Sequence, residues 1–517
     1  MAYNSPPRDL VLDNLRWLRD EIYSDPPNRI GLVPTPLDEV GIAAWVGDRY
    51  PQLWNHLTDK DVMVKHQKIK EQIYRDIYKI IFPEAEFPED QIIPEPQPQP
   101  DQQPLTRGQL KIKDNIFAYG DEYENPLFCH FGEAFSAWTR EPDRVEKQLD
   151  VIYAAGYDGI RFWDILGYYP VWYNKAVTPI GFYNKDSRWI IPTDNYYDKL
   201  SEFINIVHSK GLKVFWSRGD MNGIRYSDRV RHFENLANLV KTGRVPKEAI
   251  AIFEGLNEPW QNGADSPQEL IELVNIFKQA NPDILCTLGC PEGASEEIRD
   301  VNYWTPKPAD LPNIHGYRGG AAEDMIRHVF GMIYEIFPNT DRNFKQAFQG
   351  EPAGPGAGVT VGQINSTEEL TAIAAMSLIA KQAWVYMSGY GVFFDGPIDE
   401  QPGFWAVPKI RAMLPKDVMK NKFAYHGGRS EAIITSATGF TPAASEGPAR
   451  IDQTQSDGKC AAVAYGGRGR KIARFRRSFI GKVISTRTFE VREISVQSGT
   501  DLLLGNDYAY VIIGDYD

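Results

Sequence analysis

The feature that most constrains the fold of this sequence is a regular alternation of strand-like and helix-like segments between about residues 107 and 415. Short apolar runs, typical of strands buried on both faces, are separated by longer segments of helical periodicity. The strand candidates, in chain order, are Pro126–Gly132, Gly159–Trp163, Leu212–Trp216, Ile250–Leu256, Ile284–Gly289, Asn313–Gly316, Gln346–Gly350 and Gly391–Asp395. Eight strands with intervening helices predict a (β/α)8 TIM barrel. A doubly wound sheet is the alternative, but no glycine-rich dinucleotide turn follows the first strand.

The helix-like segments between these strands have apolar residues every three to four positions. The clearest of them are Arg144–Ala155, Tyr196–Lys210, Arg229–Lys241, Pro267–Ala280, Ala322–Phe337 and Glu368–Met387. With the strands, they place the predicted barrel over residues 107–425.

The sequence on either side of the alternation has a different character. Residues 1–82 contain two stretches, 8–24 and 61–82, with leucine and isoleucine at helical spacing, which predicts a small helical module. This module is a candidate docking site for a protein partner. Residues 83–106 are rich in proline and glutamine, as expected of an extended linker. Residues 426–517 contain short strand-like runs, which predict a C-terminal all-β domain that packs against the barrel or acts as a carbohydrate-binding module.

Charge and cysteine content narrow the classes of partner. The formal net charge is −13 at pH 7, which argues against nucleic acid. The N-terminus, MAYNSPPRDL, shows no signal-peptide pattern, and no apolar run approaches the length of a membrane span. Cys129, Cys286, Cys290 and Cys460 lack the spacing of a zinc site and are expected to be free, mostly buried thiols. We therefore expect a soluble protein, synthesised in the cytoplasm and not inserted into a membrane.

The strongest chemical signal follows the fourth strand candidate. The segment Ala249–Trp260 reads AIAIFEGLNEPW, an apolar run that ends in Glu254, Asn257 and Glu258. Pro259 cannot donate to a strand ladder, so it ends the strand. In a (β/α)8 barrel, catalytic groups sit at the carboxyl ends of the strands. We interpret Glu258 as the general acid/base of a retaining glycosidase.

Retaining hydrolysis of a glycosidic bond requires a second carboxyl group about 5 Å from the first. Glu351 is the candidate for this second carboxyl group, because it follows the seventh strand candidate and precedes a glycine-proline turn. Strand ends lie near one another around the mouth of a barrel, so Glu258 and Glu351 are predicted to face each other across it.

These motifs together resemble clan A of the glycoside hydrolases, the cellulase-like (β/α)8 enzymes. In that clan an Asn-Glu pair ends the fourth strand and a second Glu ends the seventh, as Asn257-Glu258 and Glu351 do here. An Arg near the end of the second strand is usual, and GIRFWD supplies Arg161. A His-x-Tyr after the sixth strand is also usual, and NIHGYRG supplies His315 and Tyr317.

The resemblance also implies a role for each of these residues. Glu351 would be the nucleophile, kept ionised by a nearby cation such as Arg161. Asn257 would hydrogen-bond the sugar 2-hydroxyl. Tyr317 would orient the nucleophile, and His315 would contact the sugar or a carboxylate.

Four further residues are expected to line the substrate cleft because they stand at or after strand ends: Glu133, Trp163, Trp216 and Trp260. The segment Leu166–Ile191 is a long insertion rich in tyrosine and tryptophan. Long loops in compact domains are usually functional or disordered, and we expect this one to form a wall of the cleft.

The sequence thus predicts a retaining glycoside hydrolase that cleaves β-linked oligo- or polysaccharides with two Glu residues and needs no cofactor or metal. The alternative is a catalytically silent barrel that binds glycan as a recognition or structural component of a larger assembly. The helical module, the linker and the β domain are compatible with such a part.

Overall fold

A computed structural model of the chain describes residues 108–114, 116–166, 177–179, 182–183, 189–192, 195–259, 261–289, 308–315, 326, 347–349, 366–380, 382–393, 396–416, 432–436, 450–466 and 470–517. The chain divides into two compact units, Met1–Gln97 and Pro98–Asp517, and all described residues belong to the second. The predicted helical module and linker lie outside the described residues. The predicted domain boundaries therefore remain predictions.

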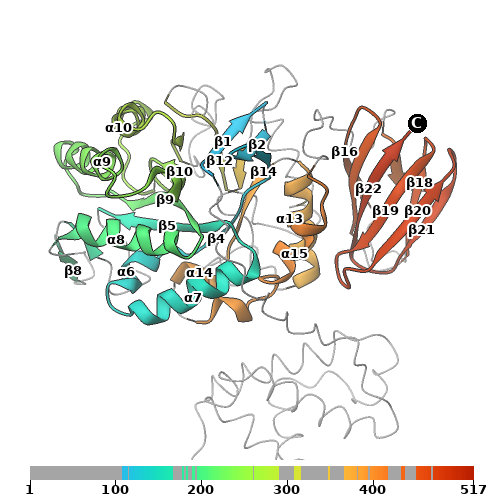
Figure 1. Ribbon diagram of the computed structural model, residues 1–517, viewed down its shortest axis with the longest axis horizontal. Helices are drawn as coiled ribbons and strands as arrows, with labels where there is room; N and C mark the ends of the chain where they lie inside the picture. Colours follow the sequence, from blue (N-terminus) through green and yellow to red (C-terminus); the bar gives the residue numbers. More distant parts are fainter. Residues whose placement is uncertain are drawn as a thin grey trace, which may run out of the picture. The chain divides into compact units, whose positions relative to one another are not determined.

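Eight parallel strands form the main sheet (Figure 1). In chain order they are β4 (Leu127–His130), β5 (Gly159–Ile165), β9 (Lys213–Asp220), β10 (Ile250–Glu254), β11 (Leu285–Thr287), β12 (Asn313–Ile314), β13 (Ala347–Gln349) and β14 (Gln382–Tyr386). The spatial order is β11-β10-β9-β5-β4-β14-β13-β12, so the last strand pairs with the first. This is the strand order of a (β/α)8 barrel, and the predicted fold class is confirmed.

Helices cover the outside of these strands, as Figure 1 shows for α8, α9 and α10 beside β5, β9 and β10. The helices of this layer are α6 (Ala134–Trp138), α7 (Pro142–Ala155), α8 (Tyr196–Ser209), α9 (Tyr226–Lys241), α10 (Pro267–Ala280), α13 (Thr367–Ile379), α14 (Gly389–Phe393) and α15 (Ala406–Met413). Of the predicted helix Ala322–Phe337, only Ile326 is described. Short 3₁₀ turns, η2 (Lys247–Ala249) and η3 (Ile398–Glu400), join some elements.

Local sequence signals explain where several helices begin and end. Ser266 precedes α10, and its hydroxyl accepts a hydrogen bond from the Glu269 backbone at 3.2 Å, while Pro267 occupies the first helical position. Ser366 caps α13 in the same way. Gly156 ends α7 in the left-handed conformation, with φ of 94°.

A hairpin at the start of the described chain fills one end of the barrel interior. Strands β1 (Leu110–Lys113) and β2 (Ile116–Tyr119) pair with each other, and β3 (Glu122–Tyr123) extends them. Their buried side chains cluster with residues from the amino-terminal halves of the barrel strands, namely Phe128, Phe215, Ala251 and Leu285. The carboxyl ends of the strands lie at the opposite end of the barrel, which is where the catalytic groups of such barrels are found.

The eighth strand is not where the sequence predicted it. We expected a helix over Glu368–Met387 and a strand at Gly391–Asp395, but α13 ends at Ile379 and β14 follows over Gln382–Tyr386. The helix and the strand are both buried, and no glycine or proline separates them, so the apolar pattern runs through both. Within the predicted strand, Gly391–Phe393 belong to the short helix α14 (Gly389–Phe393), and Phe394 and Asp395 lie outside the described residues.

The C-terminal part is all-β, as predicted. A five-stranded antiparallel sheet has the order β16-β17-β22-β19-β20 and a three-stranded sheet has the order β15-β18-β21. The strands are β15 (Ile434–Ser436), β16 (Arg450–Ser456), β17 (Lys459–Tyr465), β18 (Lys471–Phe475), β19 (Phe479–Ser485), β20 (Val491–Val496), β21 (Asp501–Gly505) and β22 (Ala509–Tyr516). Residues of α13 form one buried cluster with β17 and β22, so this domain shares an apolar core with the barrel.

Two further findings concern cysteines and hydropathy. Cys129, Cys286 and Cys460 are buried free thiols, whereas Cys290 lies outside the described residues. Among the helices that the structure describes, none has the length and apolar character needed to cross a membrane.

Candidate active site

The loop that follows β10 holds Asn257 and Glu258 at the carboxyl end of the sheet. The Asn257 backbone N–H donates to the Arg218 carbonyl oxygen at the end of β9, at 2.8 Å. Glu258 has a φ of 41°, in the left-handed region that a non-glycine residue rarely adopts. Its side chain is 18% exposed. The carboxyl group is thus partly shielded but reachable from solvent.

A buried ion pair inside the barrel supports this loop. Arg161 of β5 is fully buried, and its Nη2 donates to Glu254 Oε2 at 2.9 Å and to Asn257 Oδ1 at 2.7 Å. Asn313 of β12 donates from Nδ2 to the other oxygen of Glu254. Side chains from three strands therefore fix the orientation of the Asn257 amide.

His315, which follows β12, reaches the predicted acid/base. Its Nδ1 lies 3.0 Å from Glu258 Oε1, and its side chain is fully buried. The structure therefore brings together Arg161, Asn257, Glu258 and His315 from three βα units, whereas their roles in a reaction remain predictions.

Glu133, which follows β4, is a buried carboxyl group at the same end of the sheet. Among the described residues neither of its oxygens has a hydrogen-bond partner. Burial raises the pKa of Glu133 to about 8, although the Arg140 charge acts in the opposite direction. This group therefore carries a proton at neutral pH.

The two described tryptophans of the predicted cleft have different positions. Trp163 lies on the inner face of β5, with its ring edge against His130 at a centroid distance of 4.9 Å. Trp216 does not join the site. It is fully buried on the outer face of β9, between Phe162 and Phe253, in the layer beneath the helices. Strand residues alternate between the two faces of a sheet, and the predicted place of Trp216 in the cleft is wrong because its side chain lies on the outer face.

The remaining predicted site residues, Trp260, Tyr317 and Glu351, lie outside the described residues. From the aromatic insertion, Leu166, Pro179 and three two- to four-residue strands are described, β6 (Val177–Thr178), β7 (Phe182–Tyr183) and β8 (Trp189–Pro192). Within the described ranges, no three His, Cys, Asp or Glu side chains are grouped closely enough to hold a metal ion.

Comparison with known proteins identifies solved structures that share the fold of this chain. No protein-family model matches the chain, and no curated protein does. A solved structure described as a glycoside hydrolase superimposes with a TM-score of 0.56 at 14% identity, covering 80% of this chain and 98% of the other. A glycoside hydrolase family 5 structure from Bacteroides vulgatus ATCC 8482 gives a TM-score of 0.57 at 14% identity, covering 80% and 95%.

The chain has the fold of these glycoside hydrolase structures. The expected resemblance to the cellulase-like clan is thereby confirmed for the fold. The matched 80% of the chain is more than residues 107–425 could supply, so the similarity extends beyond the barrel.

Two site residues, Glu254 and Asn313, were not among the predicted ones. Glu254 is the last residue of β10, and Asn313 the first of β12. A charged residue inside an apolar strand was the available signal for Glu254, because such a residue must be paired when buried. Asn313 gave no comparable signal, since polar residues commonly flank strands.

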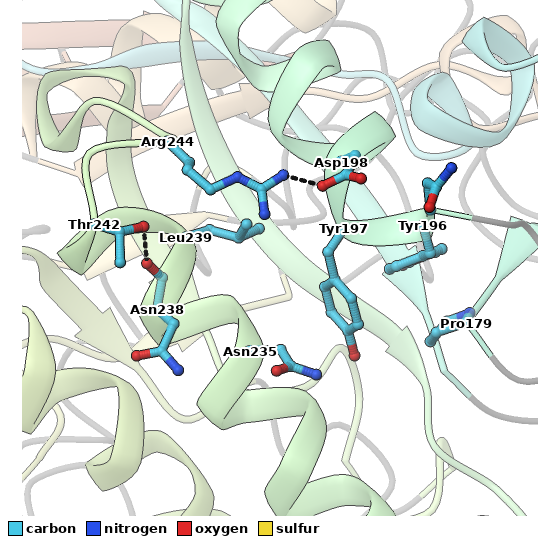
Figure 2. A pocket seen from close by; sticks show the side chains of 10 residues that line it. Pro179, Tyr196, Tyr197, Asp198, Asn235, Asn238, Leu239, Thr242 and Arg244 are labelled. Atoms are coloured by element: carbon cyan, nitrogen blue, oxygen red, sulfur yellow. Dashed lines mark hydrogen bonds and ion pairs between the residues drawn. The ribbon is translucent and has the colours of Figure 1, made fainter.

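A pocket of about 630 Å³ lies apart from this site, on the helical side of the barrel (Figure 2). It is lined by residues of α8, α9 and the segments beside them, namely Pro179, Asn195, Tyr196, Tyr197, Asp198, Asn235, Asn238, Leu239, Thr242 and Arg244. An ion pair between Arg244 and Asp198 crosses one side of it. Of the predicted site residues that the structure describes, none lines this pocket.

Proposed function

We propose that the protein is a retaining glycoside hydrolase that cleaves β-linked glycans, with Glu258 as general acid/base and Glu351 as nucleophile. The observation that supports this most directly is the contact between His315 Nδ1 and Glu258 Oε1, beside an Asn257 amide held by Arg161. Acid/base, sugar-binding amide and supporting cation thus converge at the carboxyl end of a (β/α)8 barrel.

The reaction would take place in two displacements. In the first, a Glu351 carboxylate oxygen attacks the anomeric carbon, the glycosidic C–O bond breaks, and Glu258 gives its proton to the departing oxygen. In the second, Glu258 removes a proton from water, whose oxygen attacks the same carbon and releases Glu351. Two inversions leave the anomeric configuration unchanged.

The supporting residues have separate tasks in this proposal. Arg161 holds Asn257, so the amide is already oriented when it binds the sugar 2-hydroxyl. His315 holds one oxygen of Glu258 and so limits the rotation of its carboxyl group. Tyr317 orients Glu351, and Trp163 and Trp260 contact the sugar. Glu133, protonated at neutral pH, is a hydrogen-bond donor near the cleft.

The test is reducing-sugar release from a panel of β-linked polysaccharides by wild type, Glu258→Gln and Glu351→Gln. We expect each variant to lose about 10²–10⁴-fold in rate with its fold intact. Glu234→Gln, at an exposed position of α9, is the matched control and should retain full activity. Comparable turnover by Glu351→Gln would show that the nucleophile is another residue. Retention of a polysaccharide without any release by wild type would favour the silent glycan-binding barrel.

A further inference from the structure

The loop Asn257–Gly263, called here the acid/base loop, holds Glu258 in an unfavourable backbone conformation. In the left-handed region the Cβ atom of a non-glycine residue comes too close to the following carbonyl oxygen, so this conformation is unfavourable. Such a conformation persists only when its surroundings enforce it. The contacts of this loop should therefore reveal what keeps Glu258 in place.

The first set of contacts lies within the loop. The backbone N–H groups of Gln261 and Asn262 donate to the Glu258 carbonyl oxygen at 2.9 and 3.2 Å. The Asn262 side chain donates from Nδ2 to the Asn257 carbonyl oxygen at 2.6 Å. Asn262 therefore donates to the carbonyl oxygens on both sides of the Cα atom of Glu258, the residue with the unusual φ.

The second set ties the loop to the end of β9. Asn222 donates its two Nδ2 hydrogens to the Gln261 carbonyl oxygen at 2.9 Å and to Asp220 Oδ2 at 3.2 Å. Its backbone N–H donates to Asp220 Oδ1 at 2.6 Å, so the buried carboxylate fixes Asn222. The Met221 N–H donates to the Asn262 carbonyl oxygen at 2.8 Å.

Close approach of the two segments depends on Gly263. Its φ is 98°, and a Cβ atom at this position would lie 2.6 Å from the Asn222 backbone nitrogen. Only glycine permits this packing. The two segments are thus in direct backbone contact, not merely neighbours.

We propose that Asn222 and Asn262 are positioning residues that hold the acid/base loop so that Glu258 is presented to the glycosidic oxygen. Their role in catalysis rests on the proposed function of Glu258. The substitutions that test it are Asn222→Asp and Asn262→Asp, which keep side-chain size but replace the donating N–H₂ group by an acceptor. Asn238→Asp, at an exposed position of α9, adds the same charge as a control.

The first measurement does not depend on activity. Hydrogen exchange of peptides spanning the acid/base loop should accelerate at least about tenfold in Asn262→Asp, because the two amides that bond the Glu258 carbonyl lose their support. Asn222→Asp should act in the same direction, and Asn238→Asp should match wild type. Unchanged exchange in both loop variants, with unchanged melting temperatures, would show that Asn222 and Asn262 do not hold the acid/base loop.

The second measurement separates positioning from general damage. Aryl glycosides with a good leaving group need little protonation, whereas poor leaving groups depend on the general acid. In Asn262→Asp, kcat/KM should fall about tenfold or more for poor leaving groups and less than twofold for dinitrophenyl glycosides. Equal losses for both would overturn the positioning role. Absence of hydrolysis by wild type would refute the proposed function. The exchange experiment would still decide whether Asn222 and Asn262 hold the acid/base loop.

Discussion

Two fully buried arginines of the barrel form ion pairs of the same length in opposite layers of the molecule. Arg161 lies inside the barrel, with Nη2 2.9 Å from Glu254 Oε2. Arg218 lies outside it, beneath the helices, with Nε 2.9 Å from Asp164 Oδ1. Arg161 and Asp164 are both on β5, three positions apart, so the alternation of one strand sends one group to each layer.

The two pairs differ in what their remaining bonds reach. Arg161 continues to Asn257 and so to the loop of Glu258. Arg218 instead lies over the Phe253 ring, at 4.1 Å, and donates to the Trp216 carbonyl oxygen. The same kind of ion pair therefore supports the loop of Glu258 inside the barrel and stabilises the aromatic core beneath the helices outside it.

The outer pair is nevertheless strongly ionic. Burial alone would raise the pKa of Asp164, but the Arg218 charge and contacts from His232 and Trp216 hold it below its usual range. A buried charge stabilised by several partners is costly to uncover, because each partner then loses its own compensation.

Breaking the inner pair should give the largest effect. Arg161→Met leaves Glu254 without its cation and releases Asn257, so we expect the free energy of unfolding to fall by about 3–5 kcal/mol. We also expect hydrolysis by the folded protein to fall about 100-fold, because the amide is no longer oriented. Urea titration and initial rates would measure the two losses. A variant with full activity would contradict the role assigned to this pair.

Breaking the outer pair should separate stability from activity. Asp164→Asn leaves Arg218 buried without a counter-charge, so the free energy of unfolding should again fall by about 3–5 kcal/mol. Initial rates below the melting temperature should stay within about twofold of wild type, since the Asp164 and Arg218 side chains point away from the cleft and only the Arg218 backbone touches Asn257. A loss of activity as large as that of Arg161→Met would show that the outer pair supports the active site as much as the inner pair does.

Glu133 differs from both arginine pairs, because it is a buried acid with no hydrogen-bond partner among the described residues. Its folded-state pKa of about 8 exceeds the unfolded value of about 4.3, so the folded protein keeps a proton that the unfolded chain releases. Its contribution to stability is full below pH 4 and is lost as pH rises to 8, by at most about 1.4 kcal/mol per pH unit.

Glu133→Gln should therefore be more stable than wild type at pH 8 and little different at pH 4. Urea midpoints at several pH values would test this. Asp220, whose pKa burial raises to about 7, contributes a slope of the same sign, so the profile of the variant should be flatter but not flat. A steeper profile in Glu133→Gln would contradict the assignment.

The smallest effect is expected where the β domain meets the barrel. Glu368 of α13 accepts hydrogen bonds from the Tyr508 and Ala509 backbone N–H groups. Glu368→Gln keeps an acceptor but removes the charge, so we expect a loss of about 1 kcal/mol in the free energy of unfolding. Thermal melting would measure it, with the exposed Glu234→Gln as control. A loss above about 3 kcal/mol would mean that the carboxylate has a further partner.

Much of the barrel could be predicted because its strands are short apolar runs separated by turn residues. The prediction failed at β14. Here the helix and the strand are apolar on every face, so hydrophobic periodicity cannot tell where the helix ends and the strand begins. Asn257 and Glu258 were predictable for a related reason: they stand immediately after a buried strand, where polar residues need an explanation.

The inner pair could not be predicted in the same way. Arg161 and Glu254 come from different strands, and their contact depends on strand order and on which face each residue occupies. A shift of one position exchanges the faces, as the misplaced Trp216 illustrates. Sequence signals thus identified the residues at the strand ends better than those that support them from below.

The shared core of α13 and the β domain has a consequence for synthesis of the chain. Residues Leu370–Ile379 of α13 are all buried, and part of their cover comes from β17 and β22. Both strands follow α13 in the chain, so during synthesis the apolar surface of this helix stays uncovered until β17 and β22 have left the ribosome. A chain stalled or cut before β17 would expose this apolar surface and would be prone to aggregate. The C-terminal sheet thus protects the barrel from aggregation as well as packing against it.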